Sequence, residues 1–143
     1  MVVAVCISEK KGIRKREVPY IDVKCHHGIV GDAHAGDWHR QISLLGEESI
    51  DSMRALGLNL TAGAFAENIV TRGIVLYELP VGTRLQVGET ILRVTQIGKE
   101  CHNDCEVKKI TGKCVMPTDG IFAIVIKGGT VKKGDKITLS EEK

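Results

Sequence analysis

The sequence predicts a mainly β protein, built as a closed or partly closed β-barrel with a few short helices. Short apolar or alternating segments recur with glycine between them, and only one segment has a convincing helical period. The chain also lacks the regular alternation of strand and helix patterns that is typical of parallel sheets. These observations favour a barrel or sandwich architecture.

Size and composition indicate a single domain over residues 1–143. The chain has 143 residues, of which 43% are hydrophobic, enough to close one ordinary core. The net charge is only +2 and no long block of one sign occurs, so charge gives no argument for nucleic acid or a bilayer. Only 3% of residues are aromatic, which removes the stacking surfaces of single-strand binders. We expect neither a nucleic-acid nor a membrane partner.

The N-terminal apolar run reads as a buried strand. It leads directly into Glu9, Lys10 and Lys11 and lacks the preceding basic region of a signal peptide. No apolar run approaches the roughly 20 residues needed to span a membrane. The five cysteines are an odd number and imply no set of disulfides. We therefore expect a soluble cytoplasmic protein with mostly reduced thiols.

The first half of the chain predicts three strands and one helix. The helix is predicted over Glu47–Leu56, because acidic residues occupy its first turn and Gly57 follows its end. Ile50, Met53 and Leu56 share one face, with which we expect the helix to cover the barrel. The three strands are predicted over Val2–Ser8, Arg16–Lys24 and Gln41–Leu45.

The second half predicts four more strand segments, of which the clearest form a hairpin over Arg84–Gln96. Two alternating runs flank Gly88-Glu89, and glycine at the first central position suits a two-residue type II′ turn. The second strand of this hairpin leads directly to Cys101. The other strands are predicted over Ile69–Thr71, Ile121–Lys127 and Lys136–Leu139, with turns at Gly73 and Gly128-Gly129.

A thiol-rich segment, Gln96–Met116, is the predicted functional centre. It holds Cys101, Cys105 and Cys114, three of the five cysteines, within fourteen residues. Closely spaced thiols in a reducing compartment point to redox, sulfur or metal chemistry. Lys99 and His102 beside Cys101 favour its thiolate, the form that binds soft metals or accepts sulfur.

The spacing of the three thiols leaves several alternatives open. The pattern C-x3-C-x8-C departs from the paired C-x2-C spacing of zinc sites and supplies three sulfur ligands, so His102 or a distant histidine would have to complete a tetrahedral site. A reversible Cys101–Cys105 or Cys101–Cys114 disulfide is a second alternative. Inert thiols on a loop are the third.

Two further polar segments are candidates for ligand contacts. The loop Gly31–Arg40 is rich in imidazole and carboxylate groups and could hold a metal or a phosphate-bearing ligand, although loop histidines are usually solvated. Arg40 and Lys99 are candidate anion partners. Glu67 and Asn68 lie at the start of a predicted strand, where polar groups can line the mouth of a barrel.

Taken together, the motifs resemble the MOSC domain, found at the C-terminus of molybdenum cofactor sulfurases and in small stand-alone proteins. The resemblance covers nearly the whole chain. It is carried by the segments Gly28–His34, Arg40–Leu45, Phe65–Ile69, Leu79–Gly82, Val94–Gln96 up to Cys101, and Gly120–Ala123 with Gly128-Gly129 and Gly134-Asp135.

This resemblance implies a β-barrel of MOSC type and a functional Cys101. In the family, the matching cysteine ligates molybdenum of a molybdopterin cofactor or carries sulfur destined for it as a persulfide. The implied partners are this cofactor or its sulfur donor and acceptor proteins. We expect polar cofactor contacts from Arg40, Asn68 and Lys99, with Asp32 and His34 lining the same mouth.

Two alternative functions remain open beside this resemblance. Cys105 and Cys114 are thiols that the general pattern does not require, so a thiol or metal module binding zinc or iron through the three cysteines is one alternative. The other is a molybdenum-dependent oxidoreductase that reduces N-hydroxylated compounds. The chain has no pyridoxal-phosphate-dependent desulfurase domain, so another protein would have to supply sulfur.

Overall fold

The computed structural model describes residues 1–10, 14–57, 60–98 and 119–140, and in this part of the chain strands predominate. The longest helix is α1 (Glu47–Arg54), and a single 3-10 turn forms η1 (Leu76–Glu78). The strands are β1 (Val2–Ile7), β2 (Arg16–Val18), β3 (Tyr20–Lys24), β4 (Gly28–Ile29), β5 (Ile42–Gly46), β6 (Ile69–Thr71), β7 (Arg84–Val87), β8 (Thr90–Ile97), β9 (Ile121–Lys127), β10 (Gly129–Lys132) and β11 (Ile137–Leu139).

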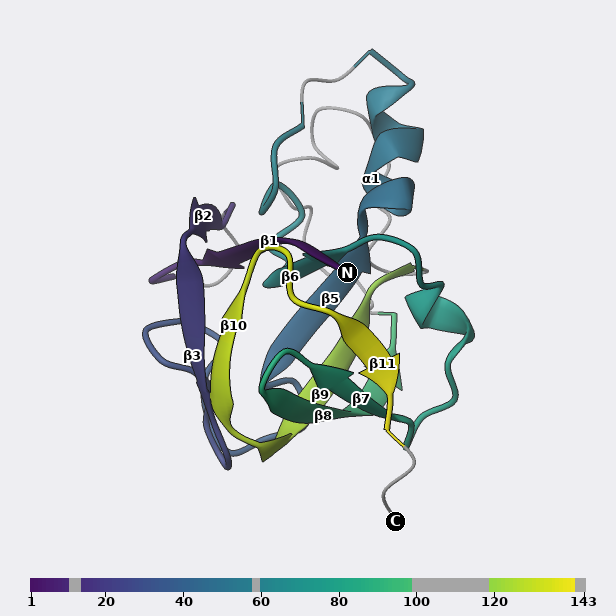
Figure 1. Cartoon of the computed structure of the whole chain (residues 1–143). Coiled ribbons are helices and arrows are strands. Elements are labelled where there is room, and N and C mark those ends of the chain that lie inside the picture. The colour runs from purple at the N-terminus through teal and green to yellow at the C-terminus, as the bar shows by residue number, and fades with distance from the viewer. Residues whose placement is uncertain (11–13, 58–59, 99–118, 141–143) are drawn as a thin grey trace.

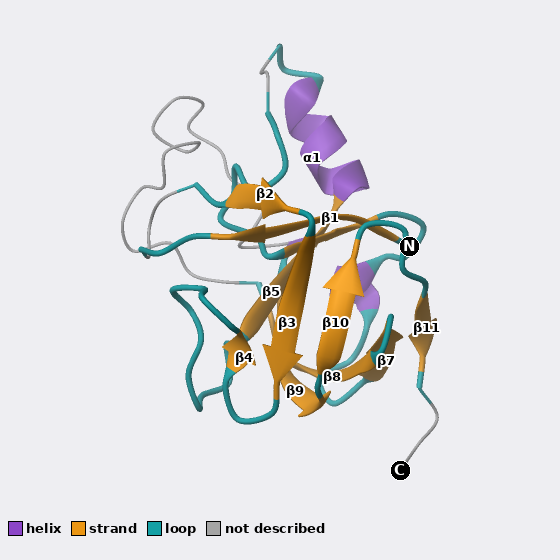
Figure 2. Ribbon diagram, turned by 60° about the vertical axis from the view of Figure 1, so that its left-hand side comes forward, coloured by secondary structure: helices purple, strands orange, loops and turns teal. Residues whose placement is uncertain are grey.

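These strands form two sheets that wrap around a common interior (Figures 1 and 2). The larger has eight strands in the order β11-β7-β8-β9-β5-β6-β1-β2, and the smaller has three in the order β10-β3-β4. Only the β5–β6 pair is parallel among the described ladders. The mainly β prediction is confirmed, but neither sheet of described strands closes on itself, so the closed barrel is not.

The local predictions were accurate where the pattern was strong. The hairpin forms, and Gly88 adopts a φ of +56°, as a primed turn requires. The helix begins at Glu47 as predicted and ends two residues early, and its face prediction was partly wrong, because Leu56 is exposed. The predicted strand Arg16–Lys24 is in fact two strands on different sheets, β2 and β3, separated by Pro19, which has no N–H to donate to a ladder.

Strand alternation divides the core into two layers. Side chains such as Val5, Leu44 and Ile121 face the interior between the two sheets, whereas their neighbours face the opposite side of the large sheet. That second layer joins Cys6 and Phe122 to Ile50 and Met53 of α1 and to the loop that carries Phe65. The helix therefore covers the outer face, as expected. Among the described residues, no helix is long and apolar enough to cross a membrane.

Candidate functional site

The thiol-rich segment lies in the chain between β8 and β9, and the described residues on either side of it are held together. The N–H of Gly98 donates to the carbonyl of Gly120 at 2.7 Å, just beyond the ladder pair Ile97 and Ile121. Gly98 has a φ of +75°, a conformation that favours glycine. Gly98 and Gly120, which flank the thiol segment in the described structure, therefore lie side by side at one point of the sheet. Lys99, Cys101, His102, Cys105 and Cys114 themselves lie outside the described residues.

Arg40 is held beside this point by two contacts. Its Nε donates to Oε1 of Gln96 at 3.1 Å, and its guanidinium lies 5.3 Å from the ring centroid of Phe122. Gln96 in turn donates from Nε2 to the carbonyl of Gly98 at 2.8 Å. A cation over an aromatic face is attracted by the ring quadrupole, so the strands that start and end the thiol segment also orient Arg40. The predicted anion partner is thus next to the base of that segment.

Asn68 has a different role in the described structure, because its side chain is fully buried. Its Oδ1 accepts from the backbone N–H of Ser43 at 3.0 Å, and its Nδ2 donates to the carbonyl of Cys6 at 3.1 Å. The amide therefore joins the strand ends of β5 and β1 across the start of β6. In this conformation it supports the sheet under Phe122, which pairs with Ser43, and does not line an open mouth.

Asp32 and His34 come together in a buried cluster at the end of β1. The backbone N–H of His34 donates to Oδ2 of Asp32 at 3.0 Å, and that of Ser8 donates to Oδ1 at 3.1 Å. Lys15 lies 2.8 Å from the same Oδ1, and both side chains of this ion pair are 0% exposed. Burial alone would raise the pKa of Asp32, but the close approach of His34 and Lys15, the charge of Lys15 and the backbone N–H of Ser8 oppose the shift, and the pKa lies well below its usual range.

Lys15 is the residue that sequence reasoning missed. It lies in a charged stretch that reads as a solvated turn, and its burial depends on a loop far along the chain. The N–H of Lys15 donates to the carbonyl of Gly63 at 2.8 Å, and a Cβ on Gly63 would lie 2.1 Å from the Lys15 carbonyl oxygen. Only a glycine, here with a φ of +90°, permits this approach. In the sequence, the glycine at position 63 was the only local indication that another backbone approaches closely there.

Glu67 is a second buried carboxyl and, unlike Asp32, it forms no ion pair with a described residue. Its Oε1 accepts from the N–H of Phe65 at 3.0 Å, while its Oε2 has no hydrogen-bond partner in the described part of the chain. Burial raises the pKa of Glu67 to about 7, although hydrogen bonds from backbone groups and the charge of Lys15 oppose the shift. Sequence reasoning placed Glu67 at the mouth of a strand, whereas the structure places it in the core.

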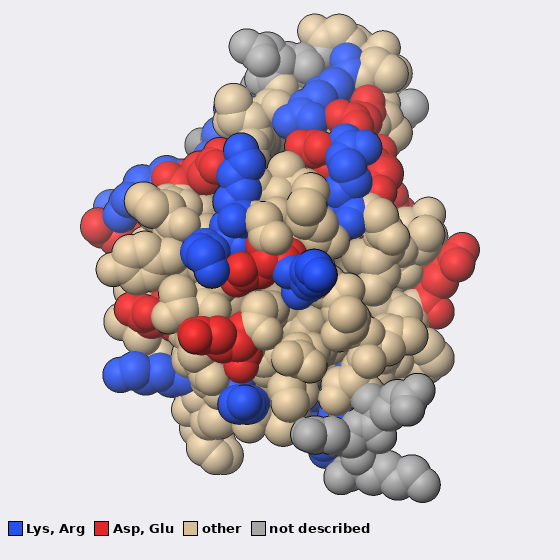
Figure 3. Space-filling view, viewed as in Figure 1, with Lys and Arg blue, Asp and Glu red and all other residues tan. Residues whose placement is uncertain are grey.

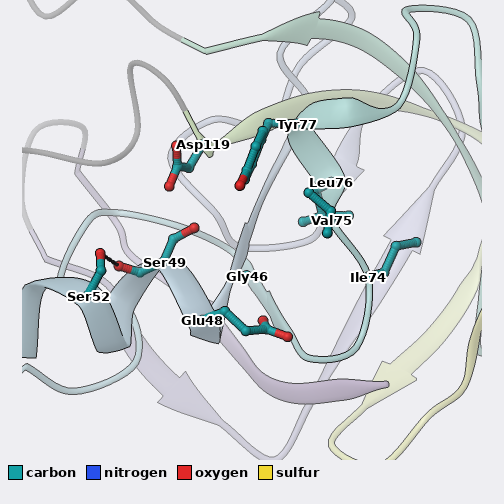
Figure 4. Close-up of a pocket in the computed structure, with 9 residues that line it drawn as sticks. All are labelled: Gly46, Glu48, Ser49, Ser52, Ile74, Val75, Leu76, Tyr77 and Asp119. Carbon is teal, nitrogen blue, oxygen red and sulfur yellow. Dashed lines mark hydrogen bonds between the residues drawn. The ribbon is translucent and has the colours of Figure 1, made fainter.

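A cavity of about 240 Å³ lies between the first turns of α1 and the η1 segment (Figure 4). Asp119, Tyr77 and Ser49 point toward a common space there. Asp119 directly precedes Gly120, so the cavity adjoins the base of the thiol segment. It is lined by Gly46, Glu48, Ser49, Ser52, Ile74, Val75, Leu76, Tyr77 and Asp119. With two carboxylates and no basic side chain among these residues, it does not suit an anion.

The histidines of the polar loop Gly31–Arg40, and His26 a few residues before it, do not form a metal site within the described residues. His26 and Asp37 lie 3.7 Å apart, with side chains 85% and 77% exposed. No group of three or more His, Cys, Asp or Glu residues that could hold a metal occurs in the described ranges. The predicted thiol and imidazole ligands Cys101, His102, Cys105 and Cys114 all lie in residues 99–118, outside the described ranges.

Comparisons with known proteins agree with this architecture. Solved structures similar to the chain include the YUAD protein from Bacillus subtilis, with a TM-score of 0.78 and 19% identity over 95% of this chain and 92% of that one. YiiM from Geobacillus stearothermophilus has a TM-score of 0.75 and 20% identity over 99% of this chain and 75% of that one. YiiM from Escherichia coli has a TM-score of 0.64 and 20% identity over 100% and 71%, respectively.

At these identities the structural likeness shows the fold alone. A search of curated proteins gave no match. The sequence profile of the MOSC domain, however, matches residues 31–138, which include Asp32, His34, Arg40 and the whole thiol segment. The chain therefore belongs to the MOSC domain family.

Proposed function

We propose that this MOSC protein binds a molybdopterin-type cofactor, or carries sulfur destined for it, with Cys101 as the functional thiol. In this proposal the whole chain acts as one domain, in a compartment that keeps its thiols reduced. The sulfur donor or acceptor is another protein. Lys99 and His102 favour the Cys101 thiolate.

The observation that carries the proposal is the position of Arg40. Its Nε and aromatic contacts fix the guanidinium beside Gly98, the residue from which the chain continues to Lys99 and Cys101. The two terminal nitrogens of Arg40 have no hydrogen-bond partner among the described residues. A guanidinium whose orientation is fixed, and whose two terminal nitrogens remain available, is suited to bind phosphate in a bidentate manner.

The described residues fit the anionic end of such a cofactor at Arg40. They do not fit it at the cavity beside α1, where Glu48 and Asp119 would repel a phosphate. Asn68 would act indirectly, because its buried amide holds the strands on which Phe122 and Arg40 rest. Asp32 and His34 would contribute from the end of β1.

Two kinds of chemistry are compatible with a functional Cys101. A bound molybdenum cofactor supplies redox chemistry at the metal, with the Cys101 thiolate as a protein ligand. In sulfur transfer, the Cys101 thiolate attacks the outer sulfur of a donor protein's persulfide. A new S–S bond forms on Cys101 as the donor's S–S bond breaks, and the electron pair leaves with the donor thiolate.

The test is metal, pterin and intact-mass analysis of protein purified from a molybdenum-replete host. We expect either molybdenum with a pterin or a mass increase of one sulfur atom on Cys101. The Cys101→Ser variant should lose both, because a serine hydroxyl stays protonated at neutral pH. Cys25→Ser is the matched control, since Cys25 is an exposed thiol outside the segment. Arg40→Met should weaken cofactor retention, and Arg93→Met, at an exposed arginine on β8, should not.

Other outcomes would favour the alternatives. Zinc or iron bound without molybdenum, and lost on substitution of Cys105 or Cys114, would support the thiol or metal module. Retention of the cofactor or the sulfur by Cys101→Ser would show that Cys101 is not the functional thiol. Reduction of N-hydroxylated compounds by the molybdenum-loaded protein would identify the reductase activity.

A further inference from the structure

The buried amine of Lys15 has three acceptors for its three hydrogens. Its Nζ lies 2.8 Å from Oδ1 of Asp32, 3.0 Å from Oγ of Ser8 and 3.0 Å from Nδ1 of His34. A lysine ammonium has three donors and no acceptor capacity. The Ser8 hydroxyl donates onward to the carbonyl of Lys10 at 2.9 Å, so its oxygen is free to accept from Lys15. Each of the three ammonium hydrogens therefore has an acceptor.

The contact with Lys15 determines which ring nitrogen of His34 carries hydrogen. A hydrogen on Nδ1 would point at the ammonium 3.0 Å away. The alternative acceptor for such a hydrogen, Oδ2 of Asp32, is 3.7 Å from Nδ1, which is too long for a hydrogen bond. Nδ1 must therefore accept from Lys15, and the neutral ring carries its hydrogen on Nε2.

The backbone of His34 is fixed as well. Its N–H donates to Asp32 at 3.0 Å, and its carbonyl accepts from Nε1 of Trp38 at 2.8 Å. The His34 side chain is 14% exposed, whereas that of Lys15 is not exposed at all. The Nδ1 edge of the ring faces the fully buried Lys15 amine, so Nε2 lies on the side of the ring away from Lys15. No partner of Nε2 occurs within the described ranges.

We infer that Lys15 is a positioning residue that fixes His34 as the Nε2–H tautomer, so that His34 offers a hydrogen-bond donor to an oxyanion of the ligand. In this state Nε2 cannot accept a proton, so His34 recognises an acceptor group and does not act as a base. Only the ligand part of this inference rests on the proposed function. The tautomer is a property of the protein alone.

The tautomer is measured directly by nitrogen-15 NMR of the imidazoles in the metal-free, reduced protein. His34→Gln assigns the His34 signals. We expect a bare Nδ1 and a protonated Nε2 near neutral pH. A protonated Nδ1, or the averaged signal of two exchanging tautomers, would overturn the inference, whatever the function of Cys101.

Two variants test whether Lys15 imposes the tautomer. Lys15→Met removes the donor to Nδ1 and should give mixed tautomers, whereas Lys10→Met, at an exposed lysine, should leave the spectrum unchanged. Since Lys15→Met leaves Asp32 buried and unpaired, Lys15→Met combined with Asp32→Asn supplies a variant without that charge. An unchanged Nε2–H tautomer in the folded double variant would exclude Lys15 as its cause.

The ligand part is tested with inorganic phosphate as the probe. Phosphate should shift the Nε2 signal of His34 in the wild-type protein and equally in Cys101→Ser, which separates this result from the cofactor test. Loss of one hydrogen bond to an anion should weaken phosphate binding about tenfold in His34→Leu, while His34→Gln, which keeps an NH donor, should bind more tightly than His34→Leu. An Nε2 signal that does not respond, or equal binding by the two variants, would overturn the oxyanion assignment.

Discussion

Two ion pairs in this protein have the same length and opposite surroundings. Lys15 and Asp32 approach to 2.8 Å with both side chains fully buried, and Arg54 and Asp51 approach to 2.8 Å with side chains 34% and 46% exposed. Figure 3 shows charges of both signs gathered on the surface over α1, the helix that carries the second pair. The distance between the charged atoms therefore does not indicate how much each pair contributes to the free energy of unfolding. A buried partner that is removed leaves an uncompensated charge, whereas an exposed one is replaced by water.

The largest expected effect comes from breaking the buried pair. Asp32→Ala should lower the free energy of unfolding by about 3 to 5 kcal/mol, because the Lys15 ammonium stays buried without its counter-charge. The Ser8 and His34 N–H groups would lose their acceptor as well. Urea unfolding of the wild-type and variant proteins measures the difference. A loss no greater than that in Asp51→Ala would show that burial does not separate the two pairs.

A smaller effect is expected from Glu67, a buried carboxyl that forms no ion pair with any residue the structure describes. Its pKa is raised from 4.5 to about 7, so between these values the folded state holds a proton that the unfolded state releases. The free energy of unfolding should therefore fall as pH rises from about 4.5 to about 7, by up to about 3 kcal/mol. The lowered pKa of Asp32 acts in the opposite sense, with stability lost as pH falls through the acidic range below 3.8.

Unfolding measurements across this pH window test the Glu67 assignment. Glu67→Gln keeps an oxygen for the Phe65 N–H and removes the titrating group, so its stability should vary less with pH than that of the wild-type protein. Glu9→Gln, at an exposed carboxyl, serves as the control. If Glu67→Gln keeps the full pH dependence, another group is responsible for it.

The smallest effect is expected for the exposed pair. Hydrogen bonds from Arg54 and then Arg72 lower the pKa of Asp51, but its side chain is in contact with solvent, and water and salt screen such pairs. Asp51→Ala should therefore shift the urea midpoint slightly, and the shift should shrink further at about 1 M salt, where the Debye length is about 3 Å. A salt-independent loss as large as that of Asp32→Ala would contradict the comparison.

Sequence patterns predicted the local elements well because each rests on neighbouring residues. The alternation around Gly88-Glu89 specified a hairpin, and the acidic start and apolar spacing of Glu47–Leu56 specified a helix. The same patterns joined β2 to β3, because alternation continues past Pro19 although the two strands lie in different sheets. The family was recognisable from short motifs spread over the chain, and the MOSC profile agrees with it.

The sequence by itself determined the strand-rich class, the family and the choice of Arg40 as a candidate anion partner, while the structure placed Arg40 beside Gln96 and Phe122. Only the tertiary structure decided that the buried side chain of Asn68 hydrogen-bonds two strands. It also decided that Lys15 is a buried cation in contact with Asp32 and His34. Whether a polar side chain meets solvent or another polar group depends on segments distant in the chain, such as Gly63 against Lys15. Local patterns carry the periodicity of burial, but the pairing of buried charges is set by which loops the sheet brings together.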